Sequence, residues 1–85
     1  MQEFDFTIKD ALGIHARPAG QLVKALKNYG SKVMITKGEK TIDASRLMSL
    51  MGLAVKCGET IHVSIEGPDE DAAYAGIRAF LEENL

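Results

Sequence analysis

One histidine near the start of the chain stands where it could carry out phosphoryl chemistry. His15 is followed by Arg17 and Pro18 within residues 13–20. Proline lacks the backbone N–H that goes unpaired in the first turn of a helix, so Pro18 predicts a helix that begins at or just before Ala16. His15 then occupies the cap position, beside free backbone N–H groups and the positive end of the helix dipole, which favour an anion. Arg17 adds a permanent cation whose donors match phosphate oxygens.

An exposed imidazole at this position could accept a phosphoryl group and give it up again. A neutral ring has one nitrogen free to attack phosphorus, and this attack needs no general base. The backbone N–H groups of Ala16 and Arg17 would then face the phosphate, together with the guanidinium of Arg17. The nearest carboxylate in the sequence belongs to Asp10, on the far side of Gly13. An isolated histidine at a helix start is more often only a helix cap, so this feature alone leaves that role open.

The composition indicates one small globular domain over residues 1–85. A chain of 85 residues with 46% hydrophobic and 26% charged residues can form one modest core and has no room for a separate cofactor domain. We therefore expect no cofactor and no metal. The net charge of −2 argues against nucleic-acid binding through bulk charge. The apolar segments are short and the acidic N-terminus does not match a signal peptide, so we expect a cytoplasmic protein without membrane insertion.

Periodic hydrophobicity predicts four strands and three helices. Alternating apolar residues predict strands at residues 3–9, 32–36, 40–43 and 60–66. Apolar stripes predict a helix from Ala16 to a left-handed cap at Gly30, a brief helix within residues 44–53 capped by Ser45, and a last helix capped by Asp69. Every strand has one polar face, so we expect an antiparallel sheet covered by helices on one side only.

The brief helix carries more apolar residues than a domain of this size can bury around so short an element. Some of them should therefore remain exposed, which is typical of a surface that docks a protein. The pattern alone leaves an irregular core equally open. The residues concerned are Leu47, Met48, Leu50, Met51 and Leu53.

The segment Gly-Ile-His-Ala-Arg-Pro-Ala resembles the active-site signature of HPr, the family of histidine-containing phosphocarriers in the bacterial phosphoenolpyruvate-dependent sugar phosphotransferase system. The resemblance continues at residues 38–51 and 65–72, and so covers essentially the whole chain. It implies an open-faced β-sandwich, an α+β fold in which three helices cover one face of a four-stranded antiparallel sheet. It also implies that His15 takes a phosphoryl group from enzyme I and passes it to sugar-specific IIA domains, and that Arg17 steadies the phosphate. Such a protein is a carrier in a relay rather than a stand-alone enzyme, and we expect a monomer.

The resemblance further implies one exposed face that both partners use in turn. On sequence grounds alone the lysines of this face could simply be solvated, and Gly20 offers a partner only backbone. The residues of the implied docking face are Gly20, Lys24, Lys27, Leu47, Met48 and Met51.

Position 46 departs from the pattern of many relatives from Gram-positive bacteria, which have a lysine followed by a serine that a dedicated kinase phosphorylates. This chain has Ser45 and Arg46 instead. A shift of one residue rotates a helical side chain by about 100°, and arginine cannot accept phosphate. We therefore expect no serine switch and no co-repressor role. A second hypothesis stays open, a regulatory binding module that acts through Leu47, Met48 and Met51, although the presence of both His15 and Arg17 favours the carrier.

Overall fold

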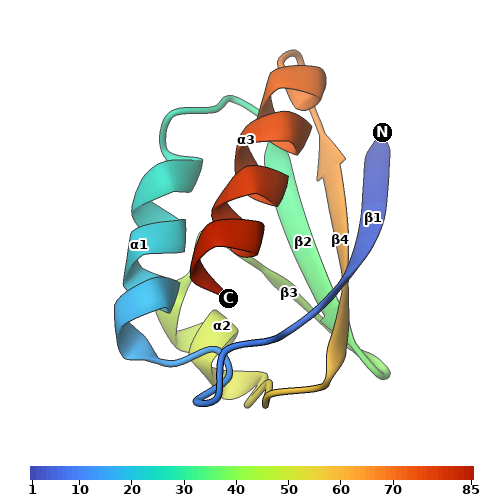
Figure 1. Ribbon diagram of the computed structural model, residues 1–85. Coiled ribbons are helices and arrows are strands. Elements are labelled where there is room, and N and C mark those ends of the chain that lie inside the picture. Colours follow the sequence, from blue (N-terminus) through green and yellow to red (C-terminus); the bar gives the residue numbers. More distant parts are fainter.

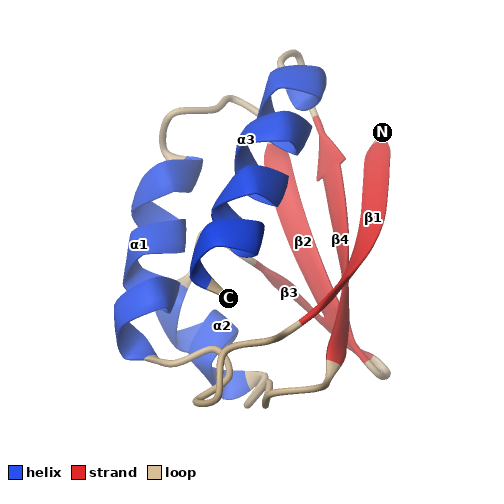
Figure 2. Cartoon of the chain, viewed as in Figure 1, coloured by secondary structure: helices blue, strands red, loops and turns tan.

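The computed structural model describes residues 1–85 as one four-stranded sheet with three helices packed on a single face (Figure 1). All neighbouring strands pair antiparallel, in the order β1-β4-β2-β3. The other face of the sheet carries no helix, as Figure 2 shows. The predicted open-faced β-sandwich is therefore confirmed. The elements are β1 (Gln2–Thr7), α1 (Ala16–Leu26), β2 (Lys32–Lys37), β3 (Lys40–Asp43), α2 (Leu47–Gly52), β4 (Thr60–Glu66) and α3 (Glu70–Asn84).

The core lies between the sheet and the helices and consists of a single cluster of 20 hydrophobic residues. In β4, Ile61, Val63 and Ile65 are fully buried and alternate with polar residues, as the period of a strand requires. The helices contribute stripes spaced by three and four residues, which is the spacing of one helix face. The buried residues of these stripes are Ala19, Leu22 and Leu26 in α1 and Ala73, Ile77 and Leu81 in α3.

The loop that leads into α1 depends on Gly13. Its φ angle is +69°, and a Cβ atom there would lie 2.2 Å from the carbonyl oxygen of Val55. Ile14, the next residue, donates its N–H to that same carbonyl at 3.0 Å. Only glycine allows this close approach, which fixes the chain immediately before His15.

The ends of α1 and α2 differ from the sequence prediction. Helix α1 ends at Leu26, and Gly30 does not adopt the left-handed conformation. The N–H groups of Lys27, Asn28 and Tyr29 instead donate to carbonyls three residues earlier, which satisfies the end of the helix without a left-handed residue.

The predicted side-chain caps at Ser45 and Asp69 are also wrong, because neither side chain makes a capping hydrogen bond. Helix α2 begins only at Leu47, and the hydroxyl and N–H of Ser45 donate to Oδ1 of Asp43 at 2.7 and 2.9 Å. Asp69 does occupy the cap position of α3, but its carboxylate accepts hydrogen bonds from Gly30 N–H and Ser31 Oγ. In both cases a competing partner satisfies the side chain. No helix is long and apolar enough to span a membrane.

Candidate functional site

His15 lies at the cap position of α1, as predicted, with extended backbone angles of φ −118° and ψ 178°. Its carbonyl accepts the first hydrogen bond of the helix, from Ala19 N–H at 3.0 Å. Its side chain makes no capping hydrogen bond, and 36% of that side chain is exposed. The imidazole is therefore free of the structural task that would otherwise explain a histidine here.

The first turn of α1 presents unpaired donors beside this imidazole. The backbone N–H groups of Ala16 and Arg17 donate to no acceptor within the chain, and Pro18 has no N–H to offer. The turn contains no acidic residue, and the exposed guanidinium of Arg17 forms no ion pair. These groups can bind an anion without first giving up another partner.

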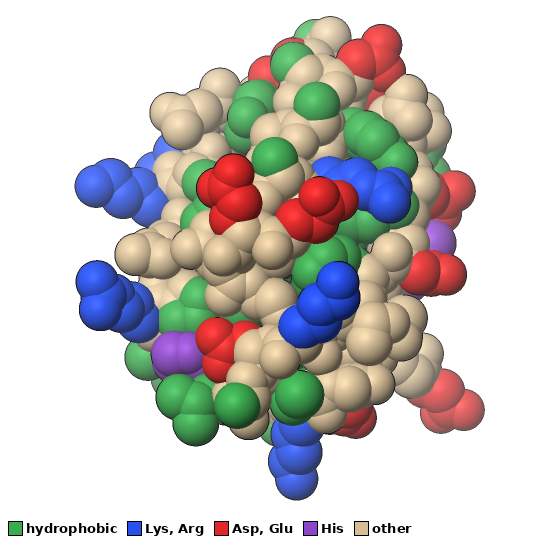
Figure 3. Space-filling view, in the orientation of Figure 1, with side chains coloured by type: hydrophobic (Ala, Val, Ile, Leu, Met, Phe, Trp, Pro, Cys, Tyr) green, Lys and Arg blue, Asp and Glu red, His purple; other side chains and the backbone are tan.

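A shallow depression of about 250 Å³ opens next to the imidazole. It lies where the start of α1, the preceding loop and the last residue of α3 meet. Figure 3 shows a histidine and an acidic side chain side by side at the lower left of the molecule, with basic side chains above them. Such an open, polar hollow suits a phosphoryl group better than an apolar ligand. Its lining residues are Asp10, His15, Arg17, Pro18, Gln21 and Asn84.

Sequence reasoning did not place three residues of this depression at the site, although it named Asp10 as the nearest carboxylate. Oδ1 of Asp10 lies 3.8 Å from Nε2 of His15, because the turn after Asp10 brings its carboxylate back toward α1. An aspartate whose side chain accepts the N–H two residues on is a common turn feature, and here Leu12 N–H donates to it at 2.8 Å. Gln21 follows Arg17 by four residues, so helical spacing could have placed it on the same side. No sequence signal connects Asn84 to His15.

The residues of the implied docking face fall into two groups. Lys24 of α1 and Lys27, the residue that follows α1, are exposed. In α2, Met48 is 82% and Leu47 40% exposed, whereas Met51 is half-buried and packs against the core. Gly20 is half-buried, and a Cβ atom there would meet nothing within 4 Å, so no close contact requires glycine at this position.

One more exposed apolar residue lies in the loop before α1. Leu12 is 72% exposed, and its N–H binds the carboxylate that faces His15. Exposed apolar side chains therefore lie both on α2 and in the loop before α1.

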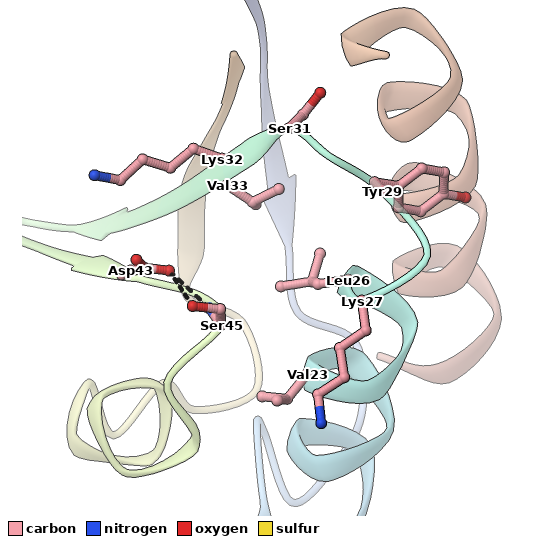
Figure 4. A pocket seen from close by; sticks show the side chains of 9 residues that line it. All are labelled: Val23, Leu26, Lys27, Tyr29, Ser31, Lys32, Val33, Asp43 and Ser45. Atoms are coloured by element: carbon pink, nitrogen blue, oxygen red, sulfur yellow. Dashed lines mark hydrogen bonds between the residues drawn. The ribbon is translucent and has the colours of Figure 1, made fainter. Parts of the chain in front are cut away.

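Ser45 lines a second hollow, of about 200 Å³, between the later turns of α1 and the sheet (Figure 4). Its hydroxyl points to Asp43, and the two donors of Ser45 hold the pKa of that carboxyl below its usual range. Arg46 is exposed and occupies the cap position of α2 without capping it. No group of three or more His, Cys, Asp or Glu side chains is placed to hold a metal ion.

Comparison with known proteins identifies the family. A family model described as "PTS HPr component phosphorylation site" matches residues 2–83. Phosphocarrier protein HPr of Lysinibacillus sphaericus is 39% identical over 83 residues, which cover 98% of this chain and 94% of that protein.

Solved structures agree in fold. The crystal structure of HPr from Thermoanaerobacter tengcongensis superposes with a TM-score of 0.92 at 32% identity, covering 98% of this chain and 93% of that one. Crh of Bacillus subtilis, whose crystal structure is described as a swapped dimer, superposes with a TM-score of 0.79 at 29% identity, covering 100% and 98%. The chain thus belongs to the HPr family, the phosphocarrier proteins of the phosphotransferase system.

Proposed function

We propose that His15 is the residue that carries the phosphoryl group, received from phospho-enzyme I and donated to sugar-specific IIA domains. The observation that carries this proposal is the free, partly exposed imidazole next to the unpaired N–H groups of Ala16 and Arg17. A dianion on His15 would gain these two donors and the guanidinium of Arg17. The chain would act as a covalently modified carrier in sugar uptake, without a bound cofactor, and not as a stand-alone enzyme.

The geometry favours Nδ1 of His15 as the attacking atom. Nε2 faces the carboxylate of Asp10, whose negative charge favours a proton on that nitrogen and would repel an incoming phosphate. The electron pair of Nδ1 would attack phosphorus, the bond from phosphorus to the donor would break, and its electron pair would stay on the donor. The proton remains on Nε2 throughout.

The partners would dock on the exposed surface beside the site. An acidic surface with an apolar centre would complement it, because exposed cations lie on and just after α1, which packs against the helix α2 that carries the exposed apolar side chains. A small interface of this kind permits the short-lived complexes that a carrier needs. The contributing residues would be Lys24, Lys27, Leu47 and Met48, with Met51 at the buried edge and the backbone of Gly20.

We further propose that the chain works as a monomeric single domain in the cytoplasm. Relatives differ in this respect, since structures of both Crh and Thermoanaerobacter tengcongensis HPr are described as dimers. Light scattering coupled to gel filtration would give the mass of one chain, 9.2 kDa, if the proposal holds.

A regulatory phosphoserine at position 45 is disfavoured. Phosphate on Ser45 would remove the hydrogen bond that the hydroxyl donates to Asp43 and bring a second negative group against that carboxylate. A binding module that acts through α2 is the second candidate function, and the exposure of Met48 supports it. Capture of a regulator that persists in His15→Ala and fails in Met48→Asp would favour the module over the carrier.

The carrier function is tested by incubating the protein with phosphoenolpyruvate and enzyme I. We expect one phosphoryl group per chain, lost in acid and absent from His15→Ala. His62→Ala, which removes the other histidine, serves as the matched control and should be phosphorylated normally. An acid-stable product, or phosphorylation of His15→Ala, would contradict the proposal.

A further inference from the structure

The carboxylate of Asp10 is held in place beside His15. Its Oδ1 atom accepts Leu12 N–H at 2.8 Å and lies 3.8 Å from Nε2 of His15. The backbone of the same residue donates to the carbonyl of Leu85 at 2.8 Å and accepts Gly13 N–H at 2.9 Å. Three hydrogen bonds therefore hold this residue, one to its carboxylate and two to its backbone.

No other side chain that lines the depression carries a negative charge. Of its lining residues, Arg17 on α1 is the only other permanently charged one. The end of α3 contributes the neutral amide of Asn84, whose Nδ2 donates to the Phe80 carbonyl at 2.9 Å, and α1 contributes the neutral amide of Gln21. Asp10 therefore provides the negative charge that the imidazole faces in this depression, on its Nε2 side.

We propose that Asp10 is a positioning residue that keeps a proton on Nε2 of the phosphorylated ring and thereby makes His15 a better phosphoryl donor. This inference rests on the proposed function and adds a determinant of the donating step. When the acceptor's nucleophile attacks phosphorus, the bond from phosphorus to Nδ1 breaks and its electron pair returns to the ring. With a proton on Nε2 the ring leaves as neutral imidazole; without that proton it leaves as the imidazolate anion, a far poorer leaving group.

Two substitutions separate the charge of Asp10 from its role in the turn. In Asp10→Asn the amide oxygen can still accept Leu12 N–H, so the turn keeps its hydrogen bond while the charge is lost. Asp10→Ala loses both. Glu83→Gln is the matched control, because it removes one exposed carboxylate from the end of α3 without touching the depression.

The test measures how the stability of the phosphorylated protein depends on pH. Each variant is phosphorylated with phosphoramidate, a chemical donor that needs no partner protein, and loss of phosphate is followed by phosphorus NMR from about pH 5 to about pH 9. The protonated ring loses phosphate faster, so the rate falls as the pH rises. We expect Asp10→Asn and Asp10→Ala to move the midpoint of this fall measurably toward acid, because both remove the negative charge that lies 3.8 Å from Nε2 and favours the protonated ring.

The expected result includes an unchanged midpoint in Glu83→Gln. A midpoint in Asp10→Asn equal to that of the wild type would overturn the inference. A shift seen only in Asp10→Ala would also overturn it, because the turn and not the charge would then be responsible. Failure of the proposed function would look different, since the wild-type protein itself would then take up no acid-labile phosphate on His15.

Discussion

Asp5 on β1 and His62 on β4 lie directly opposite each other in the sheet, with Oδ1 of Asp5 only 2.7 Å from Nδ1 of His62. The other ring nitrogen, Nε2, lies 3.0 Å from Oε1 of Glu3. Only the protonated ring can donate to both carboxylates. The contacts with Glu3 and then Asp5 raise the pKa of His62 above its usual value. Protonated His62 thus joins the edge strand β1 to the neighbouring strand β4 on the open face of the sheet.

This link predicts a stability that depends on pH. The pKa of His62 is raised in the folded protein. The contribution of the protonated ring to the free energy of unfolding is therefore fully present below the pKa of the unfolded chain, about 6.5, and is lost as the pH rises through the higher pKa of the folded protein. Urea unfolding should show wild type more stable than His62→Thr at about pH 6, with the difference shrinking toward about pH 9. The neighbouring strand β2 places only Thr36 opposite His62, so no further charge adds to the effect. A difference that stays constant over this range would contradict the assignment.

Asp69 makes the stability of the fold depend on pH in the opposite direction. Hydrogen bonds from Ser31 and Gly30 hold the pKa of Asp69 below its usual value. The stabilisation is therefore present above the unfolded value of about 4 and is lost as the pH falls through the lower folded value. Ser31→Ala should lower the midpoint of urea unfolding at neutral pH. Most of this difference from the wild type should disappear in acid. Ser64→Ala, on the open face of the sheet, is the control. An equal loss of stability in both variants would argue against a stabilising hydrogen bond between Ser31 and Asp69.

Gly76 in α3 lies against the side chain of Tyr29. A Cβ atom at position 76 would be 2.0 Å from the tyrosine hydroxyl oxygen and 3.0 Å from the adjacent ring carbon. Alanine normally favours a helix interior over glycine by about 1 kcal/mol, but we expect Gly76→Ala to be destabilising, because overpacking costs about 1–3 kcal/mol. The cost should fall in a Tyr29→Phe background, which lacks the hydroxyl.

Urea unfolding of the two single variants and the double variant measures this coupling. Gly52→Ala is the matched control, because a Cβ atom at position 52 of α2 meets nothing within 4 Å. Equal effects of Gly76→Ala in both backgrounds would show that Tyr29 does not require glycine there.

The docking face is tested by placing a negative charge at its most exposed apolar residue. Met48→Asp should weaken binding of enzyme I by about tenfold or more, or about 1.4 kcal/mol, as expected for loss of an apolar contact near the centre of an interface. Chemical phosphorylation of His15 by phosphoramidate should be unchanged. Ala75→Asp adds the same charge at an exposed position of α3. Titration calorimetry that finds both variants equally affected, or neither, would place the docking face elsewhere.

Local signals in the sequence predicted most of the fold. The position of Pro18 predicted the start of α1, and the alternation in residues 60–66 predicted β4, since each depends on neighbours along the chain. The polar caps were harder to predict. The carboxylate of Asp69 binds groups 38 and 39 residues away and therefore makes no capping hydrogen bond to α3. Local preference predicts where such a side chain lies but not which partner it binds.

The candidate site shows the same division. His15, the free N–H groups and Arg17 belong to one helical turn and could be placed together from spacing alone. Asn84 reaches the depression only through the packing of α3 beside α1, and Asp10 through a turn anchored to Leu85. The implied docking residues were expected to share one exposed face, whereas Met51 packs against the core. Contacts between distant segments decided each of these outcomes.

The central claim is that His15 carries a phosphoryl group on the ring nitrogen that faces away from Asp10. Phosphorus NMR of the protein, with its histidine rings labelled with ¹⁵N, after reaction with phosphoenolpyruvate and enzyme I tests this directly. We predict one phosphoramidate signal coupled to Nδ1 of His15 and absent from His15→Ala. A signal coupled to Nε2, a signal that persists in His15→Ala, or no phosphoramidate at all would contradict the account.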